Sequence, residues 1–220
     1  MTALRSVTFV LLLSMVTARG ATASPAPPAG CNPPAPRALR IYVINGASVV
    51  PRTLDDAKAE VAKIWTTAGL RLTWTVPPRA IEITDPGTVV VIVRRVLSRH
   101  SRVKSDSSRS VPDPALGWVL FDGEDRRGFV EVSIDAITAV VMKGVLGNKS
   151  VLTLPRRTQM DLVGRGLGRV IAHEIGHWRM GRAHMRGGLM KASLNAQDLI
   201  DWAVPPLPRG WTAGACEGRP

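Results

Sequence analysis

The sequence predicts an α/β fold, in which a twisted mixed sheet of about five strands is combined with one crossover helix, a long helix and a C-terminal helix. Two observations support this fold class. Short runs rich in β-branched residues alternate with segments whose apolar residues recur at helical spacing. One run, TVVVIV at residues 88–93, is continuously apolar, as expected of a central strand buried on both faces.

The elements at the start of the predicted sheet follow one another closely. Residues 39–44 (LRIYVI) are expected to form the first strand, and residues 71–75 (RLTWT) the second. Between them a helix begins at Thr53, where Asp56 gives a near capping box, and ends at Gly69. Its core-facing residues are Leu54, Ala57, Val61, Ile64, Trp65 and Ala68. The order strand, helix, strand, strand predicts a right-handed crossover.

Two further strands are expected after a polar, basic segment. Residues 98–114 are predicted to form a surface loop, in which His100 is solvated. Residues 117–121 (GWVLF) and 129–134 (FVEVSI) have strand composition and are separated by an Asp-Gly turn. They complete a sheet of about five strands.

Three helices are expected in the rest of the chain. Residues 136–146 form a short helix, and residues 194–202 form a C-terminal helix. Between them a long helix opens at Thr158, with Asp161 in a second near capping box, and ends near Met180.

Three glycines weaken the first half of this long helix. Gly164, Gly166 and Gly168 each cost about 1 kcal/mol relative to alanine. Either they permit a close approach of the sheet, or the helix begins only near Leu167.

Three of the four histidines lie close together in the sequence: His173, His177 and His184. The first two are spaced i, i+4, so a helix presents both imidazoles on one face, where they can share a metal ion. Glu174 is placed to reach a water on that ion without being a ligand. Gly181 can end the helix, so that the chain turns back and His184 becomes the third ligand. Three ligands leave one zinc position open for water, as in catalytic sites.

This stretch resembles the metzincin clan of zinc peptidases. The resemblance rests on HExxH at residues 173–177, on Gly181, on His184 and on the turn Gly187-Gly188-Leu189-Met190. The usual run is HExxHxxGxxH, and here one more residue precedes the glycine, which we interpret as a longer last helical turn. The greatest similarity is to uncharacterised secreted bacterial zincin-like proteins that contain HEIGH.

The resemblance implies an α+β zincin-like fold and a secreted zinc endopeptidase. One Zn²⁺ would be bound by the three histidines, with Glu174 as the catalytic base and Met190 in a turn below the metal. A peptide or protein substrate would bind along an antiparallel edge strand, and the C-terminal helix would pack beneath the site. A tyrosine that many metzincins use is missing, since Tyr42 is the only one. The edge strand corresponds to Gly117, Trp118, Val119, Leu120 and Phe121.

Two other interpretations of the same residues remain open. Asp198 or Asp201 could replace His184 as the third ligand, as acids on a second helix do in other HExxH enzymes. Alternatively, the chain is an exported basic binding protein with a structural or vestigial zinc site and no peptidase activity. A structural zinc usually has four protein ligands, and the sequence offers no convincing fourth.

The N-terminal residues 1–23 have the features of a signal peptide. Arg5 precedes an apolar run at residues 7–16, and the small residues at 21–23 suit cleavage. The apolar run is too short to span a bilayer, so no integral membrane segment is expected after cleavage. The localisation that follows is secreted or periplasmic.

A proline-rich linker at residues 24–37 is expected to lead into one domain at residues 38–220, which we expect to be a monomer. In an oxidising compartment Cys31 and Cys216, the only two cysteines, are expected to form a disulfide.

The chain is strongly basic, with a formal net charge of +12. No nucleic-acid partner is expected, because aromatic residues are few and no nucleic-acid motif is present. Anionic envelope components or an acidic substrate are the expected partners of this charge, and a merely solvated basic surface is the simplest alternative.

Overall fold

The computed structural model describes residues 38–77, 87–97, 115–122, 125–180 and 183–207. The predicted signal peptide and linker, the loop with His100, and Gly181 lie outside these residues. Cys31 and Cys216 also lie outside them, so their disulfide stays a prediction.

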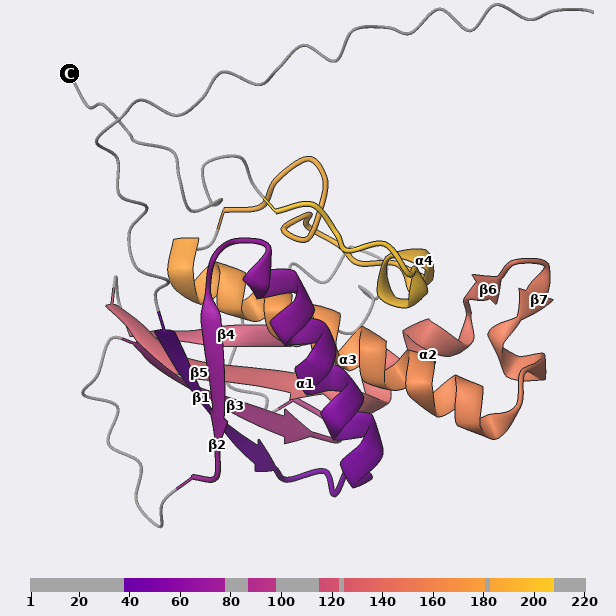
Figure 1. Cartoon of the computed structure of the whole chain (residues 1–220), viewed down its shortest axis with the longest axis horizontal. Helices are drawn as coiled ribbons and strands as arrows, with labels where there is room; N and C mark the ends of the chain where they lie inside the picture. Colours follow the sequence, from indigo (N-terminus) through magenta and orange to yellow (C-terminus); the bar gives the residue numbers. More distant parts are fainter. Residues whose placement is uncertain (1–37, 78–86, 98–114, 123–124, 181–182, 208–220) are drawn as a thin grey trace, which may run out of the picture. The chain divides into compact units, whose positions relative to one another are not determined.

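A five-stranded sheet has the strand order β2-β1-β3-β5-β4, which confirms the predicted mixed α/β fold (Figure 1). Parallel pairs join β2 to β1, β1 to β3 and β3 to β5, whereas β4 is antiparallel to β5 and forms an edge. The central strand β3 is buried on both faces as predicted, and only its last residue is exposed. The bounds are β1 Ala38–Asn45, β2 Arg71–Thr75, β3 Thr88–Arg94, β4 Gly117–Asp122 and β5 Asp125–Ser133.

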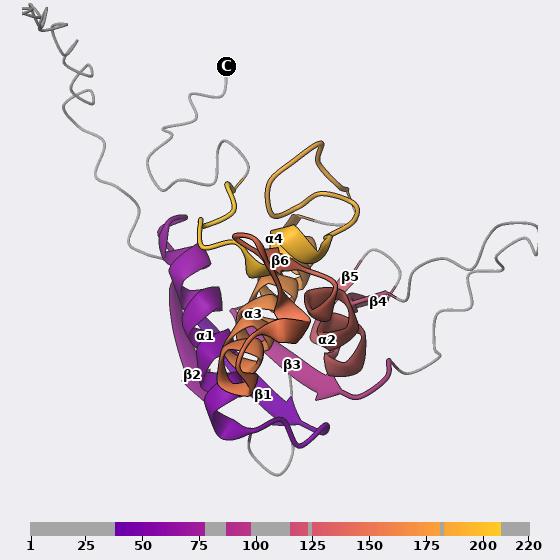
Figure 2. The ribbon, with the colours of Figure 1, turned by 90° about the vertical axis from the view of Figure 1, so that its right-hand side faces the viewer.

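The helices α1 and α3 lie side by side over one face of the sheet (Figures 1 and 2). A short hairpin and one turn of 3-10 helix join α2 to α3. Within the described residues, no helix is both long and apolar enough to cross a membrane. The bounds are α1 Pro51–Thr66, α2 Ile134–Met142, β6 Val145–Leu146, β7 Lys149–Ser150, η1 Val151–Thr153, α3 Arg156–Met180 and α4 Ala196–Ile200.

The helix starts differ from the prediction. Helix α1 begins at Pro51, and its N-cap Val50 makes no side-chain hydrogen bond, so the near capping box at Thr53 is wrong. Proline suits this position because its fixed φ fits the helix and its missing N–H needs no acceptor there. Helix α3 likewise starts at Arg156, before Thr158.

The short helices also differ at their ends. Ser133 ends β5 and its hydroxyl accepts a hydrogen bond from Ala136 N, so Ile134 belongs to α2 and not to the strand. Helix α2 stops at Met142 because the chain enters the hairpin at Val145. Helix α4 is shorter than predicted, and a capping box between Asn195 and Asp198 stabilises its start.

The glycines of α3 permit the close approach of helices, whereas we expected either a close approach of the sheet or a helix that begins only near Leu167. A Cβ on Gly164 would lie 2.8 Å from Cβ of Asp56 in α1, and one on Gly166 would lie 2.8 Å from Val141 in α2. A Cβ on Gly168 would lie 2.6 Å from the carbonyl oxygen of Ala57. The helix is therefore continuous through these glycines, and its neighbours occupy the space of the missing side chains.

Replacing Gly168 with alanine is expected to destabilise the fold by about 1–3 kcal/mol, because the backbone of α1 must move to admit the methyl group. Urea unfolding measures the change. Gly187→Ala is the control, since nothing lies within 4 Å of a Cβ there. Equal stability of the two variants would show that α1 and α3 do not pack this closely.

A buried arginine fastens α3 to two other parts of the chain. The Nε atom of Arg169 donates to Oε1 of Glu60 in α1 at 3.0 Å, and both side chains are less than a tenth exposed. Its Nη atoms donate to the carbonyl oxygens of Asp198, Asp201 and Ala203. The segment around α4 is therefore held against α3 by its backbone.

Arg169→Met is expected to cost about 3–5 kcal/mol of stability, because it leaves the Glu60 carboxylate buried without its cation. The matched control is Arg52→Met, whose ion pair with Asp161 is largely exposed and contributes about 1 kcal/mol or less. Thermal unfolding compares the two. Similar small losses would mean that water reaches Glu60.

Candidate metal centre

The C-terminal half of α3 supplies two of the predicted metal ligands and the predicted catalytic base. His173 and His177 are one helical turn apart, so their rings lie on the same face with centroids 4.5 Å apart. Both histidines and Glu174 are buried, with 6–7% of each residue exposed. The helix ends at Met180, where we predicted, and so includes the additional residue of the last turn.

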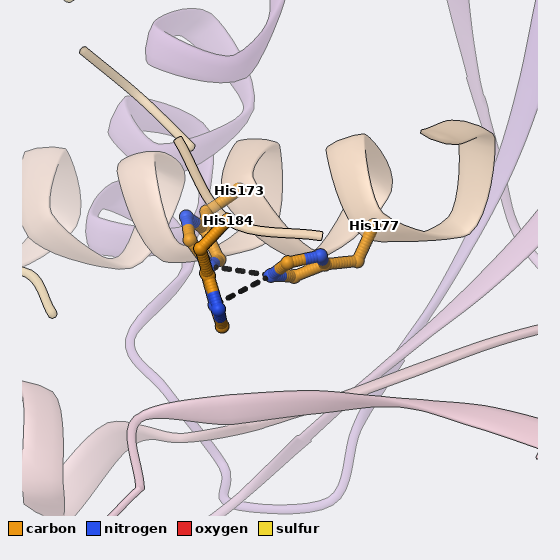
Figure 3. Close-up of side chains that lie close together, drawn as sticks. All are labelled: His173, His177 and His184. Atoms are coloured by element: carbon orange, nitrogen blue, oxygen red, sulfur yellow. Dashed lines mark hydrogen bonds between the residues drawn. The ribbon is translucent and has the colours of Figure 1, made fainter. Parts of the chain in front are cut away.

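His184 comes from the segment that follows α3 and meets the two helical histidines (Figure 3). The Nε2 atom of His177 lies 2.9 Å from Nε2 of His173 and 3.1 Å from Nε2 of His184. His184 itself is exposed, so the group opens to solvent on that side. Within the described parts of the chain, this is the group of side chains that could hold a metal ion.

These three imidazoles fit a zinc ion. Nitrogen ligands at about 2.05 Å from a tetrahedral zinc are about 3.3 Å apart. The two distances from His177 are close to this value, and all three ligand atoms lie within 4.8 Å of one another. His173 Nδ1 lies 2.6 Å from the carbonyl oxygen of Leu189, which is a hydrogen bond only if Nδ1 carries the proton. The Nε2 atom of His173 then presents a lone pair toward the other two rings, as a ligand must.

The partner of His173 is itself fixed by the C-terminal segment. Leu189 N donates to the carbonyl oxygen of Pro206 at 3.1 Å, so both backbone polar groups of Leu189 are bonded. Burial lowers the pKa of His173 to about 4, although the hydrogen bond to Leu189 opposes this shift. The imidazole is therefore neutral near pH 7 and available to a metal.

Met190 lies in a tight turn, as the resemblance implied, and is completely buried. Met185 N donates to Met190 O at 2.8 Å, and Gly188 has a φ of +72°, which favours glycine. A Cβ on Gly176 would lie 2.2 Å from the sulfur of Met190. Met190 thus packs directly on α3 at Gly176, which lies between the two helical histidines in the sequence. Our sequence reasoning overlooked Gly176, although its place within HEIGH was a signal.

The side chain of Glu174, a residue of α3, lies against the edge strand β4. An added Cβ on Gly117 would lie 3.0 Å from Cγ and 3.1 Å from Oε1 of Glu174, so the missing side chain makes room for the carboxylate. Burial raises the pKa of Glu174 to about 8 in the metal-free protein. A cation among the nearby imidazoles would favour the ionised form and oppose this shift.

The predicted substrate strand is an edge strand antiparallel to its neighbour. Val119 faces the core, Leu120 is 39% exposed, and Trp118 Nε1 donates to Oε2 of Glu131 at 3.0 Å. Glu131 is buried and also pairs with Arg94 at 2.6 Å, a contact that the sequence did not reveal. The side chain of Phe121 lies outside the described residues.

The alternative third ligands lie in other interactions. Asp198 caps α4 and pairs with Lys191. The Oδ1 atom of Asp201 accepts a hydrogen bond from Ala203 N. Within the described residues, the histidine group includes neither of them.

No family model and no curated protein matches this chain. Similar solved structures include the archaemetzincin of Archaeoglobus fulgidus, with 14% identity, a TM-score of 0.39, and coverage of 73% of this chain and 90% of that one. The archaemetzincin of Methanopyrus kandleri has 10% identity and a TM-score of 0.42, covering 74% and 86%. The expected closeness to secreted bacterial HEIGH proteins gains no support from these matches. At these scores, function has to be inferred from the chain's own geometry.

Proposed function

We propose that this chain is a zinc-dependent peptidase. The observation that carries the proposal is the convergence of three imidazoles, from His173, His177 and His184, with the buried residue Glu174 next to His173 in the sequence. Among the described residues, the group offers three nitrogen ligands and no further acid or cysteine. A set of three ligands suits an open catalytic site better than a closed structural one, which usually has four.

The chain's own residues divide the work. The three histidines would hold one Zn²⁺, and Leu189 keeps the ring of His173 in the required tautomer. When bound, zinc supplies Lewis acidity toward water and a carbonyl oxygen. Glu174 takes a proton from the attacking water and delivers it to the leaving amine. Its position against Gly117 places this base beside the edge strand.

The proposed substrate is a peptide or protein that adds to the outer edge of β4, where no strand of the described residues pairs. An antiparallel edge strand offers unpaired backbone groups, which bind an extended peptide with little sequence specificity. We propose that the protein hydrolyses internal peptide bonds of the substrate, as an endopeptidase does. We further propose secretion or export to the periplasm, a Cys31–Cys216 disulfide and a monomer.

Metal analysis and a cleavage assay test the proposal together. The purified chain is expected to contain one zinc and to hydrolyse an unfolded, fluorescently labelled protein. A chelator should abolish hydrolysis, and added zinc should restore it. Zinc retention without hydrolysis of unfolded proteins or cell-wall peptides would instead support the exported basic binding protein, and a chain that binds no zinc would refute both.

Gly117→Ala is expected to lower kcat about tenfold without loss of zinc. The added methyl group would lie 3.0 Å from Cγ of Glu174, so the carboxylate must move away from its position beside the edge strand. Zinc content and the melting temperature control for loss of the site or the fold. Full activity in this variant would show that catalysis does not depend on that position.

A further inference from the structure

The hairpin between α2 and α3 lies on the side of the described domain that faces the viewer in Figure 2 (see also Figure 1). It contains β6, β7 and η1, and the first turn of α3 follows directly. We call its exposed apolar and basic residues the hairpin tip: Lys143, Val145, Lys149, Leu152, Arg156 and Arg157.

Two aliphatic side chains of the hairpin tip are exposed to solvent. Val145 is 49% exposed and Leu152 is 66% exposed. The backbone around them is well bonded, because Ser150 caps η1 and Gln159 Nε2 donates to the carbonyl oxygens of Leu152 and Leu154 at 3.1 and 3.0 Å. Their exposure is therefore built into the local structure.

The charge of this region has one sign. The four basic residues of the hairpin tip are all exposed. The sequence has no acidic residue between Asp135 and Asp161, and Asp161 pairs with Arg52 of α1 at 3.2 Å. The hairpin tip therefore presents positive charge around exposed aliphatic side chains.

We propose that the hairpin tip docks on an anionic lipid bilayer. Such a surface offers negative head groups for the four cations and, directly below, an apolar layer for Val145 and Leu152. A soluble polyanion would satisfy the charges alone. The binding would be peripheral and reversible, since two aliphatic side chains and four cations make a small contact.

Docking through this end leaves the metal centre accessible. Helix α3 starts at the hairpin tip with Arg156 and carries His173 in its later turns. At 1.5 Å per residue, the two positions are about 25 Å apart along the helix. The inference is independent of the proposed peptidase activity, because it uses none of the metal-centre residues.

Vesicle co-sedimentation tests the proposal with the chain from Ser24 onward, which keeps every described element and omits the apolar run at residues 7–16. Vesicles of phosphatidylcholine are compared with vesicles that also contain phosphatidylglycerol. Zinc content and circular dichroism show that each variant is folded. We expect binding to the anionic vesicles alone, and weaker binding as salt increases.

Two variants and a control separate the contributions. Lys149→Gln with Arg156→Gln should weaken binding about 25-fold, since each cation near the surface contributes about fivefold. Val145→Ser with Leu152→Ser should weaken it about tenfold. The control changes similar exposed residues elsewhere: Arg40→Gln, Arg71→Gln and Val76→Ser.

Each remaining outcome contradicts the proposal. Absence of binding to anionic vesicles overturns it, as does equal weakening by the control substitutions. If the charge variant loses binding and the apolar variant does not, the hairpin tip attracts polyanions in general and does not enter a bilayer. That result would leave the zinc and cleavage experiments unaffected, so the two proposals fail separately.

Discussion

Replacing Glu174 with glutamine is expected to lower kcat/KM for an unfolded protein substrate by about a thousandfold, the usual scale for loss of a general base. Glutamine has nearly the same shape, so the contact with Gly117 can persist. It cannot accept a proton from water, however. The three imidazoles are untouched, and the zinc content should therefore stay at that of the wild type.

The measurement pairs kcat/KM with elemental analysis of the same sample. Reduced activity at full zinc content assigns Glu174 to the proton transfer. Wild-type activity in Glu174→Gln would falsify this role and would favour a structural zinc site. Burial alone gives a neutral amide no penalty beyond that of the protonated acid, so loss of fold is not expected.

Replacing His177 with alanine is expected to weaken zinc binding by about a thousandfold, since each of a few ligands contributes about 4 kcal/mol. The effect should be large because Nε2 of His177 lies between those of the other two histidines. Competition with a coloured chelator measures the affinity. Activity should fall in parallel at limiting zinc.

The same assay distinguishes the possible third ligands. His184→Ala should weaken zinc binding in the same way, whereas Asp198→Asn should leave it unchanged, because Asp198 is engaged with Asn195 and Lys191. Unchanged affinity in His184→Ala, with loss in Asp198→Asn, would reverse the assignment. Unchanged affinity in His177→Ala would remove this centre altogether.

Local patterns made much of the fold and the site predictable. His173 and His177 are close because helix geometry alone places i and i+4 on one face. The central strand β3 could be recognised because burial on both faces requires the continuous run of β-branched residues. The edge position of β4 followed from the order of elements in the resemblance, and not from its own residues.

The errors arose where a distant or stronger partner decides the outcome. Pro51 sets the start of α1, so a capping pattern two residues later had no effect. The glycines of α3 could be recognised as poor helix formers, but their neighbours in α1 and α2 are far away in the sequence. Arg169 was missed for the same reason, because Glu60 and the carbonyl groups near α4 are set by tertiary packing.

The dependence of His173 on Leu189, and of Leu189 on Pro206, has a consequence for the timing of maturation. A polypeptide is made from its N-terminus, so α3 is synthesised well before Pro206. Until the last described residues are available, His173 lacks its fixed orientation, and Arg169 lacks its carbonyl partners in the segment after Leu189. The metal centre would thus be completed only after Pro206 has been synthesised, which would delay any hydrolytic activity until that point.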